Sequence, residues 1–62
     1  MIYRHEIINN NLYLYLDLKE EYSNELSILS KDFLSNNNIN YTGDKVYLII
    51  NNILVKVIKK DF

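Results

Sequence analysis

Four stretches of the chain have the hydrophobic content and length of β-strands, and one of them alternates strictly. In residues 12–18 a Leu occupies every second position, and Tyr, Tyr and Asp lie between them. This period of two is typical of a strand with one buried face. The other three strand candidates are residues 2–8, 45–50 and 53–59.

Clusters of Asn separate these stretches. Asn tolerates the left-handed backbone region and bonds to nearby backbone, so it suits tight turns. Residues 9–11 therefore predict a hairpin with a two-residue turn of type I′, and Asn51 and Asn52 predict the turn of a second hairpin. A two-residue first turn, formed either by Asn9-Asn10 or by Asn10-Asn11, places Tyr3, His5 and Ile7 on the Leu side of the sheet, and Arg4, Glu6 and Ile8 on the side of Tyr13, Tyr15 and Asp17. A three-residue turn would reverse the first strand.

A helix is predicted within residues 19–35, because one set of apolar positions recurs there at helical spacing. That stripe consists of Tyr22, Leu26, Leu29 and Phe33. The Asn cluster at 36–38 is predicted to end the helix. Two starts stay open, a capping box and a simple N-cap: Asp17 with Glu20, or Ser23 with Glu25 in the first turn.

The last part of the chain predicts a short extended piece at 39–41, a turn at 42–44 and the second hairpin. Uninterrupted pairing across its turn gives one fully aliphatic face: Val46, Leu48, Ile50, Ile53, Val55 and Val57. The opposite face then holds Lys45, Tyr47, Ile49, Leu54, Lys56 and Ile58. The aliphatic face is the one that we expect the helix to cover.

Together these elements predict a single α+β domain over residues 1–62, with the order ββαββ. The expected architecture is a four-stranded sheet with one helix packed on one face. This element order resembles a β-grasp or protein-G-like arrangement. The resemblance implies a fold, not a function, because one element order serves many functions.

Composition narrows the class of protein. The chain has 48% hydrophobic and 24% charged residues and a formal net charge of −1, which is ordinary for a globular domain. It has no Cys, so a disulfide framework and a thiolate zinc site are excluded. No apolar run is long enough to span a bilayer or to resemble a signal peptide, so we expect a cytoplasmic protein without membrane contact. Ten Asn, nine Ile and six Lys, with no Ala or Pro, indicate an AT-rich genome, for example that of a phage or mobile element.

One helix can cover only one face of the sheet, and the predicted opposite face is unusually apolar for a face in contact with water. A domain of this size also has a small core and gains from a partner. We therefore expect a non-enzymatic protein–protein interaction or inhibitor protein, which self-associates through this Tyr-rich face or through an edge strand. The predicted interaction face consists of Arg4, Tyr13, Tyr15, Tyr47, Ile49, Leu54 and Lys56.

The alternative is a single-stranded nucleic-acid-binding module that uses the same face, because exposed aromatic rings beside cations can stack bases and hold phosphates. The acidic sequence pI of about 5.6 and the presence of Glu6 and Asp17 on that face count against it. His5, the only His, is expected to pack on the Leu side near the sheet edge. No catalytic residue, metal site or cofactor is predicted, since no cluster has the required residue types and spacing.

Overall fold

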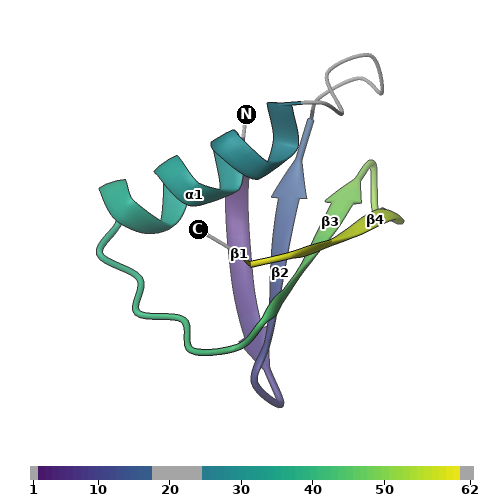
Figure 1. The fold of residues 1–62 in the computed structure, drawn as a ribbon. Coiled ribbons are helices and arrows are strands. Elements are labelled where there is room, and N and C mark those ends of the chain that lie inside the picture. Colours follow the sequence, from purple (N-terminus) through teal and green to yellow (C-terminus); the bar gives the residue numbers. More distant parts are fainter. Residues whose placement is uncertain (1, 18–24, 61–62) are drawn as a thin grey trace.

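The computed structural model describes residues 2–17 and 25–60, and the side chain of Val55 lies outside this description. It is an α+β fold with one helix and a mixed sheet, which confirms the predicted fold class. The helix lies across one face of the sheet (Figure 1). The elements in chain order are β1 (Ile2–Ile8), β2 (Asn11–Leu16), α1 (Leu26–Asn36), β3 (Lys45–Ile50) and β4 (Ile53–Lys59).

The strand order across the described sheet is β1-β2-β3-β4. The two hairpins are antiparallel, and β2 and β3 run parallel at the centre. A parallel pair needs a long crossover, which here contains α1 (Figure 1). The resemblance to a β-grasp arrangement therefore extends to element order but not to strand order, because the strands nearest the chain ends form the two edges.

Both hairpin turns have the predicted two residues, and the first has the predicted type I′ conformation, which the second shares. Asn9 and Asn10 have φ values of 52° and 61°, and Asn51 and Asn52 have values of 54° and 63°. Positive φ at both central residues is the mark of a type I′ turn, which Asn tolerates. The first turn pairs Ile8 with Asn11 and sets the register of the whole hairpin, so His5 lies opposite Leu14 on the Leu side as predicted.

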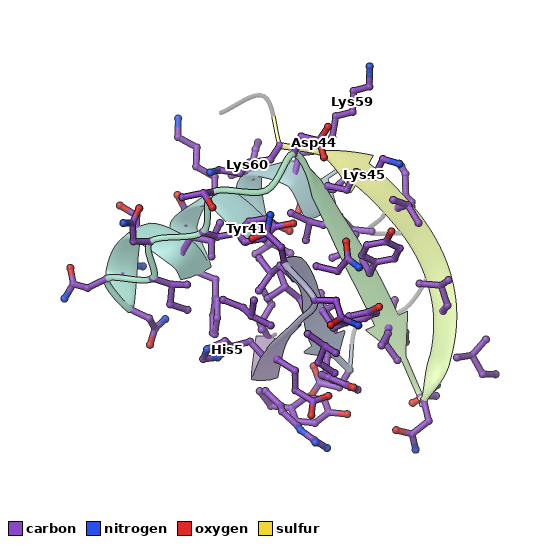
Figure 2. The ribbon with its side chains drawn as sticks, turned by 90° about the horizontal axis from the view of Figure 1, so that it is seen from below. His5, Tyr41, Asp44, Lys45, Lys59 and Lys60 are labelled. Atoms are coloured by element: carbon purple, nitrogen blue, oxygen red, sulfur yellow. The ribbon has the colours of Figure 1, made fainter. Side chains whose placement is uncertain are left out.

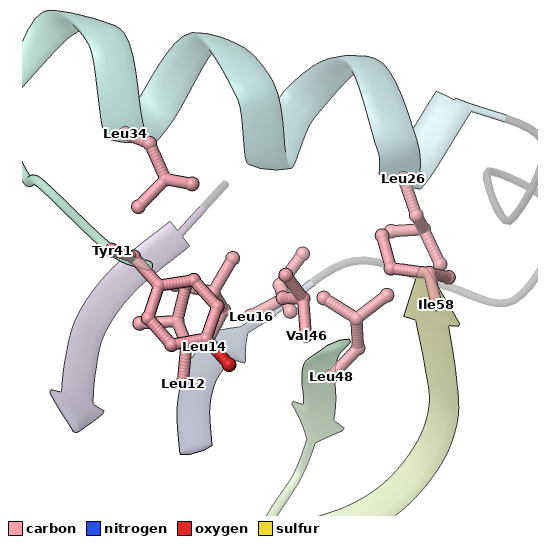
Figure 3. Close-up of a cluster of buried hydrophobic side chains, with 9 residues drawn as sticks. All are labelled: Leu12, Leu14, Leu16, Leu26, Leu34, Tyr41, Val46, Leu48 and Ile58. Carbon is pink, nitrogen blue, oxygen red and sulfur yellow. The ribbon is translucent and has the colours of Figure 1, made fainter. Parts of the chain in front are cut away.

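The core lies between α1 and the sheet (Figure 3). The alternating Leu residues of β2 are its centre, because each has at most 1% of its surface exposed. Burial of these side chains supplies the hydrophobic free energy that holds the helix against the sheet. The buried apolar set is Leu12, Leu14, Leu16, Leu26, Leu34, Tyr41, Val46, Leu48 and Ile58.

Helix α1 has a buried face that differs in part from the predicted stripe. Leu26 is buried as expected, but Ser30 and Leu34 are its buried companions, while the predicted Leu29 and Phe33 pack only partly against the core. The Ser30 Oγ donates a hydrogen bond of 2.7 Å to the carbonyl of Leu26, which satisfies its buried hydroxyl.

The helix ends as the Asn cluster predicts, since the Asn37 N–H donates to the Phe33 carbonyl and Asn38 has a φ of 54°. Its N-cap residue is Glu25, which makes no side-chain capping bond. The predicted Glu20, Tyr22 and Ser23 lie outside the described residues, so neither predicted capping arrangement can be compared.

A β-bulge in β1 corrects the predicted position of Tyr3. Ile2 pairs with Leu16 and Arg4 pairs with Tyr15, so Tyr3 is an extra residue with no partner position in β2. Ile2 therefore takes the place on the Leu side and packs against the core, while Tyr3 has 57% of its surface exposed. The prediction that Tyr3 joins the Leu side was wrong, because a single extra residue reverses the alternation beyond it.

A second bulge, in β4, corrects half of the predicted second hairpin. Ile49 pairs with Leu54 as expected, but Leu48 pairs with Lys56, which leaves Val55 as the extra residue. From Lys56 to the end of β4, each side chain therefore lies on the face opposite to the one that uninterrupted pairing predicts. Ile58 is buried in the core at 8% exposure, and Val57 is 45% exposed. The predicted positions of Lys56, Val57 and Ile58 were therefore wrong.

Candidate interaction surface

The sheet face opposite α1 carries aligned rows of side chains that run across the strands, and we call it the outer face. Partners in neighbouring strands share a face, so the registers define the rows. The two central rows are Glu6, Tyr13, Tyr47 and Val57, and Arg4, Tyr15, Ile49 and Leu54. A third row at one end holds Ile8, Asn11, Lys45 and Lys59.

The centre of the outer face is a pair of stacked rings. Tyr13 and Tyr47 lie opposite each other on the parallel strands, with ring centroids 4.9 Å apart and an angle of 25° between the ring planes. Both side chains are half-buried by their neighbours in the sheet. A stacked pair of this kind is a rigid apolar platform, because each ring limits the rotamers of the other.

At the β1 side of the face, Arg4, Glu6 and Tyr15 form a connected polar group. The Tyr15 hydroxyl donates a 2.5 Å hydrogen bond to Glu6, and the Arg4 guanidinium lies 3.0 Å from the other Glu6 oxygen. Arg4 also lies over the Tyr15 ring, 4.8 Å from its centroid. These contacts hold Tyr15 in place and neutralise the carboxylate beside it.

This group shifts two pKa values in opposite directions. The hydrogen bond from Tyr15, and secondly the positive charge of Arg4, hold the pKa of Glu6 below its usual value. The same bond to Glu6, with desolvation and the negative charge of Glu6, raises the pKa of Tyr15. The bond therefore stabilises the fold between two limits of pH: it is lost as acid protonates Glu6, and lost again as alkali ionises Tyr15.

We expect Tyr15 to ionise at a higher pH than an ordinary tyrosine when the folded protein is titrated with alkali. The phenolate absorbance should show a component that is delayed to higher pH, and Tyr15→Phe should remove it. Glu6→Gln should keep the phenol but return that component toward the ordinary range, because a neutral amide lacks the charge that opposes ionisation. A titration curve that is the same in all three proteins would contradict the bond.

Six of the seven predicted interaction residues lie together on the outer face: Arg4, Tyr13, Tyr15, Tyr47, Ile49 and Leu54. The seventh, Lys56, pairs with Leu48 and so lies on the helix side of β4, at the bulge. Val57 takes a place on the face that the sequence did not predict. The sequence of residues 53–59 has no feature that predicts the bulge. The alternation of residues therefore could not predict that Lys56 leaves the outer face or that Val57 joins it.

The third row gives the outer face a basic end. Lys45 and Lys59 are directly opposite each other on β3 and β4, and both are exposed. Two like charges in this position repel each other.

The other features of the described residues that were candidates for a site are His5 and a hollow beside α1. His5 is exposed, and its ring meets the Phe33 ring edge to face at 5.6 Å. A shallow hollow of about 230 Å³ lies beside the end of α1, and the Lys60 ammonium at its rim donates to the Tyr41 carbonyl. Within residues 2–17 and 25–60 no three His or acidic side chains gather as metal ligands, and no helix is long and apolar enough to cross a membrane.

Comparison with protein families, with curated proteins and with solved structures finds no match to this chain. Its function must therefore be argued from its own surface.

Proposed function

We propose that this protein is a non-enzymatic protein that works by contact, and that it binds protein surfaces through the outer face. The observation that carries the proposal is the pair of adjacent central rows on the side of the sheet opposite α1, which bring Tyr13, Tyr47 and Val57 beside Tyr15, Ile49 and Leu54. No described element of the chain packs over this face (Figure 1). Uncovered apolar surfaces of this kind are typical of interaction sites.

The composition of the face supports a protein partner. Tyr and Arg are enriched where protein interfaces concentrate their binding energy, since they bury a large area and keep a polar group available. Tyr13 and Tyr47 are already held by stacking, so binding would cost little further side-chain entropy. Leu54 and Val57 extend the apolar area toward β4, where both are about half exposed.

A single-stranded nucleic acid is the second candidate, and the facing pair Lys45 and Lys59 is the observation that favours it. Two features weigh toward protein instead. The Arg4 guanidinium is paired with Glu6, which also places a negative charge on the face. The rings of Tyr13 and Tyr47 stack on each other, which leaves less ring surface free for bases.

A photoreactive side chain placed on the outer face should test the proposal directly. We expect a photoreactive residue at Leu54 to form a discrete protein adduct in cells that express the protein. The matched position is Ile28, which is 62% exposed on α1 on the other side of the molecule and should give none. Adding Tyr47→Ser should reduce the Leu54 adduct about tenfold or more, as expected for a central aromatic residue of an interface.

The adduct also separates the candidate partners. A band at twice the chain mass shows a second copy, and a band of another mass shows a different protein; both support the proposal. An adduct that nuclease removes and protease does not would assign the face to nucleic acid. The proposal fails if Leu54 gives no more adduct than Ile28, or if Tyr47→Ser leaves the adduct unchanged.

A further inference from the structure

No described strand pairs with β1 on the side away from β2, and the backbone groups that face this edge can be assigned. In a type I′ turn the Ile8 carbonyl accepts from the Asn11 N–H, so this pair faces inward. Hydrogen-bonded and non-bonded pairs alternate along an antiparallel ladder, so Glu6 and Arg4 also direct their backbone groups at β2. The N–H and C=O groups of His5 and Ile7 therefore lie in the plane of the sheet and point outward at its edge, away from β2.

The side chains along this edge form a pattern that is complementary to itself. Arg4 and Glu6 are one residue to either side of His5, and they carry opposite charges. We propose that β1 pairs antiparallel with β1 of a second copy of this chain, about a two-fold axis at His5. The two His5 residues then exchange both backbone hydrogen bonds, and each Arg4 lies directly opposite a Glu6 of the other copy.

The free backbone groups of β1 allow several registers of the two strands, and the charges of Arg4 and Glu6 favour the one with its axis at His5. An axis at Glu6 would place the two Glu6 side chains opposite each other, and an axis at Arg4 would do the same with two guanidinium groups. An axis at Ile7 would place neither Arg4 nor Glu6 opposite a charged residue of the other copy. Only the axis at His5 forms two attractive pairs, and these are the closely spaced, non-hydrogen-bonded positions of the ladder.

The other edge of the sheet is protected against the same pairing. Strand β4 carries its bulge at Val55 and exposes Lys56 and Lys59, and a bulge and Lys side chains are two ways in which proteins block edge pairing. Figure 2 shows the Lys59 side chain at the β4 side of the molecule and His5 on the far strand, so the two edges are well separated. The second copy therefore fits β1 and not β4.

Pairing at β1 would join two sheets into one. Both helices would lie on one side, and the two outer faces would merge into a single Tyr-rich surface on the other. The inference thus deepens the proposed function and rests on it for the role of the assembly. The two can fail separately, because the cross-link experiment below changes only His5 and Ile7 and leaves Tyr13, Tyr47 and Leu54 of the outer face unchanged.

The absence of Cys from the chain allows a cross-link test of the register. In the full chain we expect His5→Cys to oxidise to a disulfide-linked dimer, because opposite hydrogen-bonded residues have Cα atoms about 5.5 Å apart, within disulfide range. Ile7→Cys is the matched control on the same edge and face, and it should remain a thiol, because its counterpart in the second copy is displaced along the strand by more than about 10 Å. Equal cross-linking of the two, or cross-linking of Ile7→Cys alone, would overturn the proposal.

A charge exchange tests the same pairing without a covalent bond. Arg4→Glu alone and Glu6→Arg alone should each self-associate about tenfold or more weakly than the wild type in sedimentation velocity, because both pairs become repulsive. Mixed in equal amounts, the two variants should form a heterodimer, since every charge then meets its opposite. Circular dichroism should show each variant folded.

Three results would refute the β1 dimer: a wild-type chain that is monomeric at millimolar concentration, a mixture of folded variants that does not associate, or assemblies that grow past two copies as β1-to-β4 pairing would. A monomer whose Leu54 adduct persists would retain the proposed function and discard this inference. A dimer with no Leu54 adduct would retain the β1 pairing and discard the proposed function.

Discussion

Leu14→Ala is expected to unfold most of the protein at room temperature. Leu14 has no exposed surface and lies at the centre of β2, opposite Leu48 on the neighbouring strand. Truncation of a fully buried Leu costs about 2–5 kcal/mol, since transfer energy is lost and a cavity remains. Small domains have unfolding free energies near the lower end of the usual range of about 5–15 kcal/mol. The expected cost of Leu14→Ala is therefore most of the free energy of unfolding.

Urea denaturation followed by circular dichroism measures this effect. The wild type should show one cooperative transition, and Leu14→Ala should show little folded signal before urea is added. Ile28→Ala is the control, because that side chain is an aliphatic group of similar size that projects from α1 into solvent; it should change the free energy of unfolding by less than about 0.5 kcal/mol. Similar midpoints for the two variants would mean that Leu14 is not at the centre of the core.

Local signals in the sequence were sufficient for the hairpins and the fold class. The alternation in residues 12–18 predicts the buried face of β2, and the paired Asn residues predict both turns, because few other residues adopt positive φ at low cost. These two facts predict which residues of β1 and β2 share a face near the turn, and with it the membership of Tyr13 and Tyr15 in the outer face; they leave open whether Asn9-Asn10 or Asn10-Asn11 fills the turn, which the observed pairing of Ile8 with Asn11 decides. Most of the candidate surface follows from them.

The bulges could not be predicted, because they have no distinctive residue here. Bulges often contain Gly, yet the extra residues are Tyr3 and Val55. Tertiary packing decides the second one: uninterrupted pairing would direct Ile58 away from α1, whereas the bulge brings it into the core between α1 and the sheet (Figure 3). The bulge thus buries the Ile58 side chain and exposes that of Val57, and Val57 enlarges the apolar area of the outer face.

The distribution of charged residues among the strands indicates the strand order, which the order of the elements along the chain does not. Charged residues are concentrated in the first and last strands, whereas β2 has none and β3 has only Lys45 at its start. Central strands lose water on both edges, so the least charged strands belong in the middle. The observed order follows this rule, with β2 and β3 paired at the centre.

The segment between α1 and β3 was predicted only as a short extended piece, yet it contains a buried aromatic residue. Tyr41 is 4% exposed and closes the end of the core between the helix and the sheet (Figure 2). Its hydroxyl donates a 2.6 Å hydrogen bond to the Lys45 carbonyl and lies 3.2 Å from the Asn10 carbonyl. The ring thereby connects the crossover to β3 and to the first turn.

Gly43→Ala is expected to destabilise the protein by displacing this ring. A Cβ at position 43 would overlap the Tyr41 hydroxyl and lie 2.7 Å from Cε1, closer than any real contact. Gly43 has no positive φ, so the cost is steric and does not come from its backbone conformation. Because the hydroxyl is held at Lys45 and the ring is enclosed, the ring cannot simply rotate away. Forced overpacking of this kind costs about 1–3 kcal/mol.

A double-mutant cycle with Tyr41→Leu tests this cause. A shorter side chain at 41 leaves room for the new methyl group, so Gly43→Ala should cost clearly less in the Tyr41→Leu background than in the wild type. Thr42→Ala, at the exposed neighbouring position, should change the urea midpoint little. Equal costs in both backgrounds would show that Gly43 is required for another reason. A cost confined to the wild type would establish that the sole Gly of the chain is there to admit the ring that closes the core.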